Sequence, residues 1–388
     1  MNLVDRAHAP RAVCCIDLDA LVHNLAEVRR VVRPGVAICG VVKANAYGHG
    51  AVPVARALEA AGIEQMAVAS LDEARELREA GVATPLLVLG GVAPEEAAEA
   101  ADLGLAVVVW DARAVRALAA ATGPDRRLRV HVKLDTGMHR IGAQEADLEP
   151  LAAALRDAPS LEVEGVLSHL ACADEPGHPS VARQVAEFER LGARLEAAGI
   201  RPRIRHLANS AGVLADERAH CDMVRVGLLL YGCAPHPQLA SRLDLRPVMH
   251  LRTRVAQVKQ VAPGDSAGYG WTFTAQRPTT LAILPVGYAL GYPRALSNRG
   301  EVLIRGRRAP VVGTVSMEHL AVDVTAIPGV AVGDTVTLWG SDGNERIDVM
   351  ELGARAGTIG YELLAGVSSR TPRAYASSSD QRGRIGEP

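Results

Sequence analysis

The sequence predicts an α/β protein: a (β/α)8 TIM barrel followed by a C-terminal, mostly-β domain. The chain has 388 residues, more than the roughly 250–300 at which one hydrophobic core stops growing, so we expect two domains. Up to about residue 226, short β-branched runs alternate with helical stretches. After Pro247, strand-like runs follow one another with no long helix between them.

Short apolar runs in the first part are the expected barrel strands. They lie at residues 36–42, 66–69, 86–89, 106–110, 128–134, 163–167, 204–207 and 223–226. Helical stretches at 71–80, 94–103 and 181–198 separate them, and this alternation implies parallel strands with right-handed crossovers. A set of eight closes naturally into a barrel. A doubly wound open sheet is the alternative architecture.

The second part has the pattern of a mostly antiparallel β domain. Its expected strands are 251–261, 279–286, 301–304, 309–315, 321–324 and 335–339, with one short helix at 349–356. We therefore place the barrel at 18–243 and the β domain at 244–376. The polar tail at 377–388 is expected to be disordered.

Composition points to a small-molecule partner. The formal net charge is −2 and arginine is interspersed with acidic residues, which argues against nucleic-acid or membrane binding. The start lacks a secretory signal and no apolar run approaches ~18 residues, so we expect a cytoplasmic protein. The six cysteines show no CxxC spacing, and no HExxH or Cys/His pairing occurs, so we expect no disulfide framework and no metal.

The stretch VVKANAYGHG places a lysine directly after the first barrel strand. Of the 42 lysines and arginines only three are lysines, Lys43, Lys133 and Lys259. Chemistry in such barrels takes place at the carboxyl ends of the strands. The polar or glycine positions there are Lys43, Tyr47, Lys133, Asp135, Arg140, His169, His206, Asn209, Ser210, Arg225 and Gly227.

These residue types together suit pyridoxal phosphate. The Ser210 hydroxyl and the bare backbone at Gly227 suit a phosphate. A lysine in the same mouth suits a Schiff base with a carbonyl cofactor. An arginine that reached the pyridine nitrogen could only donate, leaving that nitrogen unprotonated and the ring a weaker electron sink.

Single residues carry less weight than the set. One lysine after a strand is more often a surface residue, and lone histidines or arginines are more often structural. Several tyrosines stand next to a glycine, and four of these are candidates, which favours a site over random loops but also fits packing in the β domain. The four are Tyr47, Tyr269, Tyr288 and Tyr361. The joint placement is what favours an active site.

The ordered motifs resemble the alanine racemases. VVKANAYGHG is similar to the cofactor-lysine motif of that family, and KLDTGMHRIG, SHLACADE, HLANSAG, DMVRVGLLLYG, GYGWTFTA and GYALGYPR are similar to its later motifs. The resemblance extends from IDLDALVHNL to RTPRAY. It implies a pyridoxal phosphate enzyme, a homodimer with shared active sites, that supplies D-alanine for peptidoglycan. It also implies that the N-terminal strand at 11–17 joins the β domain.

The resemblance implies a role for each matched residue. Lys43 would bind the cofactor and act as one base, and Tyr269 from the other protomer would act as the second. Arg225 would meet the pyridine nitrogen, supported by His206, and His169 would orient Tyr269. Lys133 matches a position that is carbamylated in members of the family. The remaining assignments are Tyr47, Asn209, Ser210, Gly227, Leu228 and Tyr361 for the cofactor, Arg140 for the substrate carboxylate, and Met317 and Tyr288 for the entrance.

Some departures and alternatives stay open. The family usually has aspartate where this chain has Leu290, and it often has arginine at the position of Thr314 and aspartate at that of Glu318. A serine or broad-specificity racemase is therefore the closest alternative. A non-catalytic cofactor carrier would lack the β domain and Tyr269. A decarboxylase of the same fold would place a glutamate where Arg225 stands.

Overall fold

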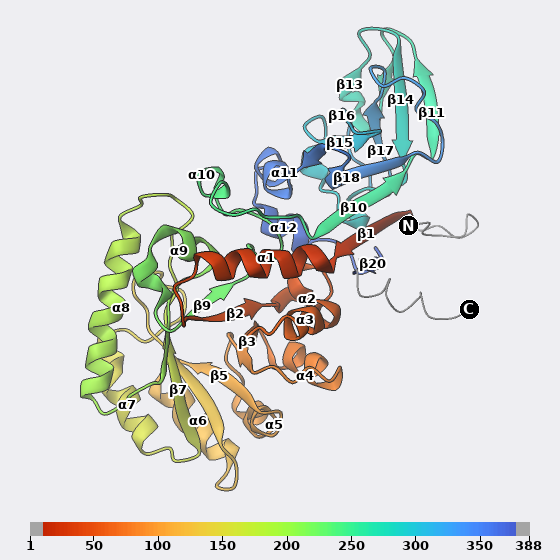
Figure 1. Cartoon of the computed structure of the whole chain (residues 1–388). Coiled ribbons are helices and arrows are strands. Elements are labelled where there is room, and N and C mark those ends of the chain that lie inside the picture. Colours follow the sequence, from red (N-terminus) through yellow and green to blue (C-terminus); the bar gives the residue numbers. More distant parts are fainter. Residues whose placement is uncertain (1–10, 378–388) are drawn as a thin grey trace, which may run out of the picture. The chain divides into compact units, whose positions relative to one another are not determined.

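The computed structural model describes residues 11–377, which form two compact units (Figure 1). The barrel unit comprises residues 21–46 and 51–245. The β unit comprises the described residues up to Ala20, residues 47–50, and the chain from Arg246 onward. The predicted disordered tail lies outside the described residues from position 378. No helix in the described part is both long and apolar enough to cross a membrane.

Within the described residues, the barrel unit contains eight parallel strands in the order β8-β7-β6-β5-β4-β3-β2-β9. They are β2 (Ala37–Val41), β3 (Gln65–Val68), β4 (Leu86–Val88), β5 (Leu105–Val109), β6 (Leu128–Lys133), β7 (Leu161–Leu167), β8 (Ile204–His206) and β9 (Met223–Val226). Backbone bonds from Asp222 N to Arg205 O and from Arg225 N to Ala208 O, both 2.9 Å, join the two ends of this order. The sheet thereby closes into a barrel.

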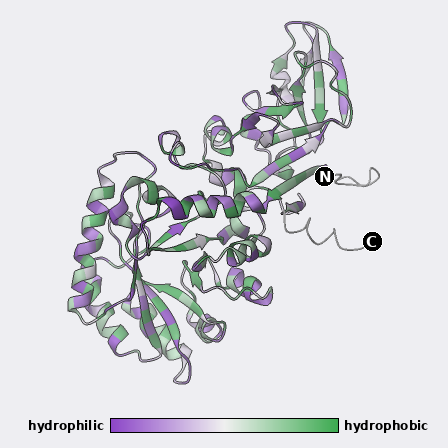
Figure 2. Ribbon diagram, in the orientation of Figure 1, coloured by the Kyte–Doolittle hydropathy of each residue, from purple (hydrophilic) through white to green (hydrophobic). Residues whose placement is uncertain are grey.

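Helices precede, connect and follow the barrel strands. They are α1 (Leu18–Val31), α2 (Lys43–Tyr47), α3 (Ala51–Ala60), α4 (Leu71–Glu79), α5 (Ala97–Asp102), α6 (Ala112–Thr122), α7 (Leu148–Arg156), α8 (Ser180–Ala197), α9 (Ser210–Ala215) and α10 (Pro237–Ala240), with 3-10 turns η1 (Pro94–Glu96), η2 (Glu145–Asp147) and η3 (Glu217–His220). Figure 2 shows hydrophilic and hydrophobic residues alternating along α8. Its buried Val181, Val185 and Phe188 recur at helical spacing, so one face packs inward.

The β unit is built around a ten-stranded sheet in the described residues, ordered β11-β14-β17-β16-β15-β18-β10-β1-β20 with β19 beside β18. Its strands are β1 (Ala12–Asp17), β10 (Met249–Arg254), β11 (Gln257–Val261), β14 (Thr279–Leu284), β15 (Glu301–Ile304), β16 (Arg307–Val312), β17 (Leu320–Asp323), β18 (Thr335–Asp342), β19 (Glu345–Ile347) and β20 (Arg373–Ala376). Only β1 and β20 pair in parallel there. The barrel and this mostly antiparallel unit confirm the predicted fold class.

Shorter elements complete the β unit. They are the two-stranded ribbon β12 (Ser266–Ala267) and β13 (Phe273–Thr274), helices α11 (Val349–Ala356) and α12 (Gly360–Ala365), and 3-10 turns η4 (Tyr269–Trp271), η5 (Tyr288–Leu290) and η6 (Arg294–Leu296).

The single strand predicted over 251–261 is wrong, because the structure has two strands there. β10 pairs with β18, whereas β11 pairs with β14. Between them Val255 N donates to Asp334 O at 2.9 Å and Ala256 N to Ile283 O at 2.8 Å. The chain changes partners at this point, which an apolar run in the sequence does not reveal.

Candidate active site

Side chains at the carboxyl ends of the barrel strands form one positively charged cluster. Lys43 follows β2, Lys133 ends β6 and Arg225 lies on β9. The charges of Arg140 and Arg225 lower the pKa of both lysines, and the charge of Lys43 also lowers the pKa of Lys133. Because parallel strands end at the same rim of a barrel, these distant positions meet there. The structure thus brings four of the predicted site residues together.

A left-handed turn follows Lys43. Ala44, Asn45, Ala46 and Tyr47 have φ angles of 52–54°. None of them is a glycine, and the left-handed conformation costs such residues about 1–2 kcal/mol each. Ala46 N donates to Val42 O at 2.8 Å, and Asn45 Oδ1 accepts from the backbone N–H of the first residue of α3 at 2.7 Å. Strain that persists against such a cost is characteristic of functional sites.

The Lys43 amine is shifted toward its neutral form. Burial lowers its pKa, since a less polar environment disfavours the ammonium ion. The charges of Arg140 and Arg225 lower the pKa further, whereas the carboxylate of Glu73 raises it. The net decrease makes Lys43 a better nucleophile and base near neutral pH than an ordinary lysine.

Arg225 is fixed by backbone carbonyls. Its Nη1 donates to His206 O at 2.9 Å, and its Nη2 donates to Ser168 O at 2.6 Å and Leu207 O at 3.1 Å. The residue is only 4% exposed, and burial lowers its pKa to about 10, so it stays protonated at neutral pH. Its Nε–H has no acceptor in the part of the chain that the structure describes. The guanidinium therefore keeps one donor for a ligand.

Two buried histidines connect Arg225 to Glu164. Arg225 Nη1 lies 3.0 Å from His206 Nδ1, His206 Nε2 lies 2.8 Å from His131 Nδ1, and His131 Nε2 lies 3.0 Å from Glu164 Oε2. A guanidinium only donates and an ionised carboxylate only accepts, so both neutral rings carry their proton on Nε2. His131 and Glu164 were not predicted. The available signal was a histidine two residues before Lys133, on the same face of its strand.

The buried histidines make stability depend on pH. Burial lowers the pKa of His131 and lowers that of His206 well below its usual value. Below about pH 6.5 the unfolded chain binds protons on these two imidazoles that the folded chain does not bind. As the pH falls, the free energy of unfolding therefore decreases by up to about 1.4 kcal/mol per pH unit for each ring. We expect a lower urea midpoint at about pH 5.5 than at about pH 7.5, and a smaller difference in His206→Asn. Equal midpoints in the unmodified protein would contradict this.

His169 is also neutral. Burial is the largest cause that lowers its pKa, followed by the charges of Arg225 and Arg140. Its Nδ1 lies 3.2 Å from Arg225 Nη2 and accepts from that donor. A neutral imidazole with Nδ1 accepting carries its proton on Nε2, so His169 presents an Nε2–H donor.

A hydroxyl and backbone amides lie beside the start of α9. Ser210 Oγ accepts from Gly227 N at 3.0 Å. The neighbouring Leu228 N–H makes no hydrogen bond within the described residues. Asn209 caps α9 by accepting from Gly212 N at 2.8 Å, which fixes Ser210. Hydroxyl and free amide groups of this kind suit phosphate oxygens.

Asp135 shapes the loop that carries Arg140. Its Oδ1 accepts from Gly137 N and His139 N, both at 3.0 Å, and its Oδ2 lies 3.1 Å from His139 Nδ1. The Arg140 side chain is exposed and has no carboxylate partner among the described residues. It is therefore available for a carboxylate ligand.

Tyr47 and Tyr361 form a pair in the β unit. Their ring centroids lie 6.0 Å apart, and burial raises the pKa of Tyr47 to about 12, so its hydroxyl stays protonated. Gly48 has φ +79°, and a Cβ there would lie 2.2 Å from Leu364 O. Arg373 Nε donates to Gly48 O at 3.1 Å. This close approach requires glycine and fixes the segment that carries Tyr47.

Three more predicted site residues of the β unit are exposed. Tyr269 is 73% exposed, Tyr288 43% and Met317 55%. Thr314 Oγ1 donates to Tyr269 O at 2.8 Å, which fixes the turn η4 that carries Tyr269. These three side chains therefore lie at the surface of the β unit.

The other two departures from the family pattern have structural roles. The Leu290 side chain is 5% exposed and packs in the β unit. Glu318 forms ion pairs with Arg11 at 3.3 Å and with Arg370 at 3.1 Å.

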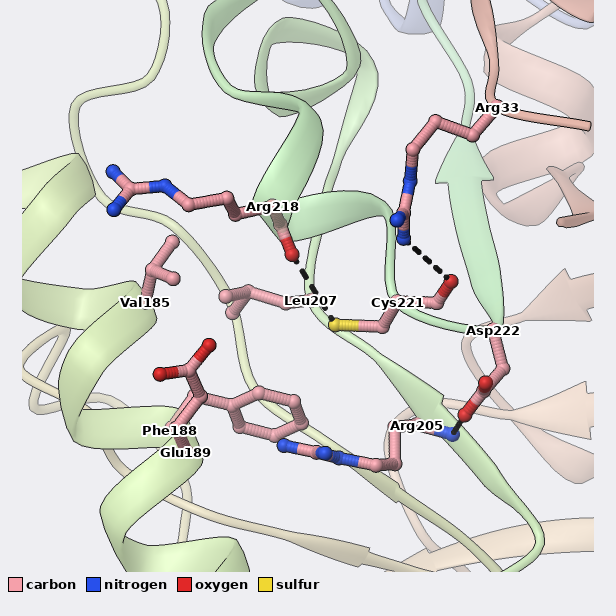
Figure 3. A pocket seen from close by; sticks show the side chains of 9 residues that line it. All are labelled: Arg33, Val185, Phe188, Glu189, Arg205, Leu207, Arg218, Cys221 and Asp222. Atoms are coloured by element: carbon pink, nitrogen blue, oxygen red, sulfur yellow. Dashed lines mark hydrogen bonds between the residues drawn. The ribbon is translucent and has the colours of Figure 1, made fainter.

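A separate pocket of about 330 Å³ lies beside α8, at the amino end of β9 (Figure 3). None of the predicted site residues lines it. Figure 3 shows the Arg205 guanidinium against the Phe188 ring, and the distance to the ring centroid is 5.6 Å. Arg218 already pairs with Asp216 at 2.7 Å. The carboxylates of Glu189 and Asp222 line the pocket together with the remaining arginines. Its charge is nearly balanced, so the cluster at the carboxyl ends remains the candidate site.

Comparison with known proteins identifies the family. The sequence matches the alanine racemase N-terminal domain over residues 16–235 and the alanine racemase C-terminal domain over residues 248–375. The chain belongs to the alanine racemase family. It is accordingly an isomerase that acts on amino acids, and the resemblance seen in the motifs is confirmed.

Individual alanine racemases are similar over nearly the whole chain. The alanine racemase of Symbiobacterium thermophilum is 46% identical over 94% of this chain and 97% of its own. The solved biosynthetic alanine racemase of Pseudomonas aeruginosa is 41% identical with a TM-score of 0.87, covering 95% of this chain and 100% of the other. That of Bacillus anthracis, solved with bound L-Ala-P, is 35% identical with a TM-score of 0.89, covering 98% and 97%.

Proposed function

We propose that the protein interconverts L-alanine and D-alanine with pyridoxal phosphate, using Lys43 and Tyr269 of the partner subunit as two bases. The observation that carries the proposal is the cluster in which Lys43, its pKa lowered by burial, lies among the charges of Arg140 and Arg225. Membership of the alanine racemase family supports the substrate. The product would supply D-alanine for peptidoglycan.

The predicted site residues fit pyridoxal phosphate. Lys43 would bind its aldehyde carbon, and Ser210 with the free amide of Leu228 would bind phosphate oxygens, joined by the Gly227 amide when it exchanges Ser210 Oγ for phosphate. The free Nε–H of Arg225 suits an unprotonated ring nitrogen, because arginine only donates. Tyr47 and Tyr361 would add hydroxyl donors for the phosphate, and His206 supports Arg225. When bound, the cofactor supplies an electron-withdrawing ring that makes the substrate Cα proton acidic.

Two bases on opposite faces suit racemisation. One face of Cα loses its proton and the other gains one, so a base on each side performs both transfers directly. The Nε2–H of His169 would donate to the hydroxyl oxygen of Tyr269 of the partner subunit and orient it for proton transfer at Cα.

The other site residues would orient the substrate and suppress side reactions. Arg140 would bind the substrate carboxylate through its exposed guanidinium. Met317 and Tyr288 would narrow the entrance. Arg225 would leave the ring nitrogen of the cofactor unprotonated, and the weaker electron sink would favour proton return at Cα over side reactions. Substantial release of carbon dioxide or keto acid would contradict this assignment.

Lys133 is suited to carbamylation. Burial is the largest cause that lowers its pKa to about 8, helped by Arg225 and Arg140, so roughly half of the amine is neutral at about pH 8. The neutral amine attacks carbon dioxide, forming an N–C bond and releasing one proton. The resulting carbamate would pair with Arg140. We expect labelled bicarbonate to give a carbamate carbon signal that is absent in Lys133→Arg. Equal signals in both proteins would contradict carbamylation of Lys133.

Cofactor attachment can be mapped directly, because the chain has only three lysines. The protein is incubated with pyridoxal phosphate and reduced with borohydride, and its peptides are analysed by mass spectrometry. We expect the pyridoxyl group on Lys43 and not on Lys133 or Lys259. Labelling of another lysine, or none, would contradict the proposed site.

The shared site of a homodimer can be tested by mixing inactive chains. Lys43→Ala and Tyr269→Phe proteins are combined, and subunit exchange is verified with a mass-tagged chain. If each site takes Lys43 from one subunit and Tyr269 from the other, mixed dimers contain one intact site and recover activity. No recovery after verified exchange would contradict sharing.

A further inference from the structure

We propose that Glu73 is a positioning residue for Lys43: its carboxylate fixes the left-handed turn after Lys43 and places a negative charge near the Lys43 amine. The proposal rests on the proposed function for the role of Lys43. The role we assign to Glu73 acts through the backbone beside Lys43 and through charge. It was not among the predicted site residues.

The carboxylate of Glu73 links the ends of two neighbouring strands. Glu73 Oε1 accepts from Ala44 N at 2.6 Å, and Oε2 accepts from Ala69 N at 2.7 Å. Ala44 directly follows Lys43 after β2, and Ala69 directly follows β3. β2 and β3 are adjacent in the barrel. One side chain therefore fixes the lysine turn to the next strand through charge-assisted hydrogen bonds.

The turn needs such support. It contains four consecutive non-glycine residues with positive φ, beginning at Ala44, and such conformations persist only when surrounding contacts stabilise them. The bond from Glu73 engages the first of these residues. Without it the turn is free to relax toward right-handed backbone, which would redirect the Lys43 side chain.

Glu73 also acts on Lys43 through charge. Lys43, Lys133, Arg140, Arg225 and His169 interact electrostatically at the barrel mouth. Glu73 carries the negative charge that raises the Lys43 pKa, opposing burial and the two arginines. Neutralising Glu73 therefore lowers the Lys43 pKa further and makes the amine neutral at lower pH.

A simple helix-capping role is the competing explanation. Glu73 stands in the first turn of α4, where Ser70 is the N-cap and accepts from Glu73 N at 3.4 Å. Loss of a cap destabilises the helix, but it leaves the titration of Lys43 unchanged. Ser70→Ala is thus a matched control for capping. Glu76→Gln, an exposed position on the same helix, is a matched control for charge.

The test measures lysine reactivity in the full chain without cofactor. Acetylation rates of the three lysines are followed from about pH 6 to pH 10 by peptide mass spectrometry, with exposed Lys259 as the internal reference. In Glu73→Gln we expect the Lys43 midpoint to fall by about half a pH unit or more. Hydrogen exchange of the Ala44 amide should become faster. Neither change is expected in Ser70→Ala or Glu76→Gln.

Glu73→Asp separates the two roles and serves if Glu73→Gln does not fold. It keeps the charge but cannot reach both amides, so exchange at Ala44 should rise while the Lys43 midpoint stays near that of the unmodified protein. An unchanged Lys43 profile and unchanged Ala44 exchange in Glu73→Gln would overturn the proposal. An equal midpoint shift in Ser70→Ala would do the same. These outcomes need no cofactor, so they are distinguishable from failure of pyridoxal phosphate to attach to Lys43.

Discussion

Replacing Lys43 with alanine should lower kcat for racemisation by at least about 10⁴-fold. The substitution removes the group that would bind the cofactor covalently and one of the two bases. Base catalysis alone contributes roughly 10²–10⁴-fold, and loss of covalent attachment adds to this. The assay is loss of optical activity from L-alanine with pyridoxal phosphate in excess.

Lys259→Ala is the matched control, because Lys259 is an exposed lysine of the β unit. It should keep the activity of the unmodified protein. Both variants should unfold at similar temperatures. Retention of more than about one per cent of kcat in Lys43→Ala would contradict the assignment of Lys43.

Replacing Tyr269 with phenylalanine should lower kcat by roughly 10²–10⁴-fold in both directions. The change removes one hydroxyl from an exposed ring, so folding should be unaffected. Enantiomers have equal free energies in water, so kcat/KM must fall equally for L-alanine and D-alanine. Cofactor attachment to Lys43 should persist, as borohydride reduction would show.

Exchange of the Cα proton for deuterium in heavy water distinguishes the loss of one base from a general loss of activity. With Lys43 still present, one enantiomer of alanine should exchange its Cα proton for deuterium without inversion, whereas the other should exchange far more slowly. Trp271→Phe, an equally exposed position in the same turn, is the control and should racemise normally. Equal exchange of both enantiomers in Tyr269→Phe would show that Tyr269 is not a base.

The barrel was predictable because its signals are local. Runs such as LAVVV in β5 are buried at every position, as expected for parallel strands covered on both faces. The division of 251–261 into β10 and β11 was not predictable, because it depends on which distant strand each half pairs with. Likewise, nothing local shows that residues 47–50 pack in the β unit.

The charged part of the site was predictable for a related reason. Lys43 follows β2, Lys133 ends β6 and Arg225 is the penultimate residue of β9, and topology alone brings strand ends together. Glu73 and Glu164 were missed, because a glutamate in a helix or strand of an arginine-rich chain ordinarily forms a surface ion pair. Their roles depend on which backbone amide or imidazole each carboxylate reaches, and that is a property of the folded structure.

Proton exchange with a panel of single enantiomers tests alanine racemisation by this protein most directly. The protein and pyridoxal phosphate are incubated in heavy water with L-alanine, L-serine and larger amino acids, following optical activity, Cα deuterium and carbon dioxide. We expect L-alanine to lose optical activity and gain deuterium fastest, without gas release. Exchange of no amino acid, or release of carbon dioxide in place of racemisation, would contradict it.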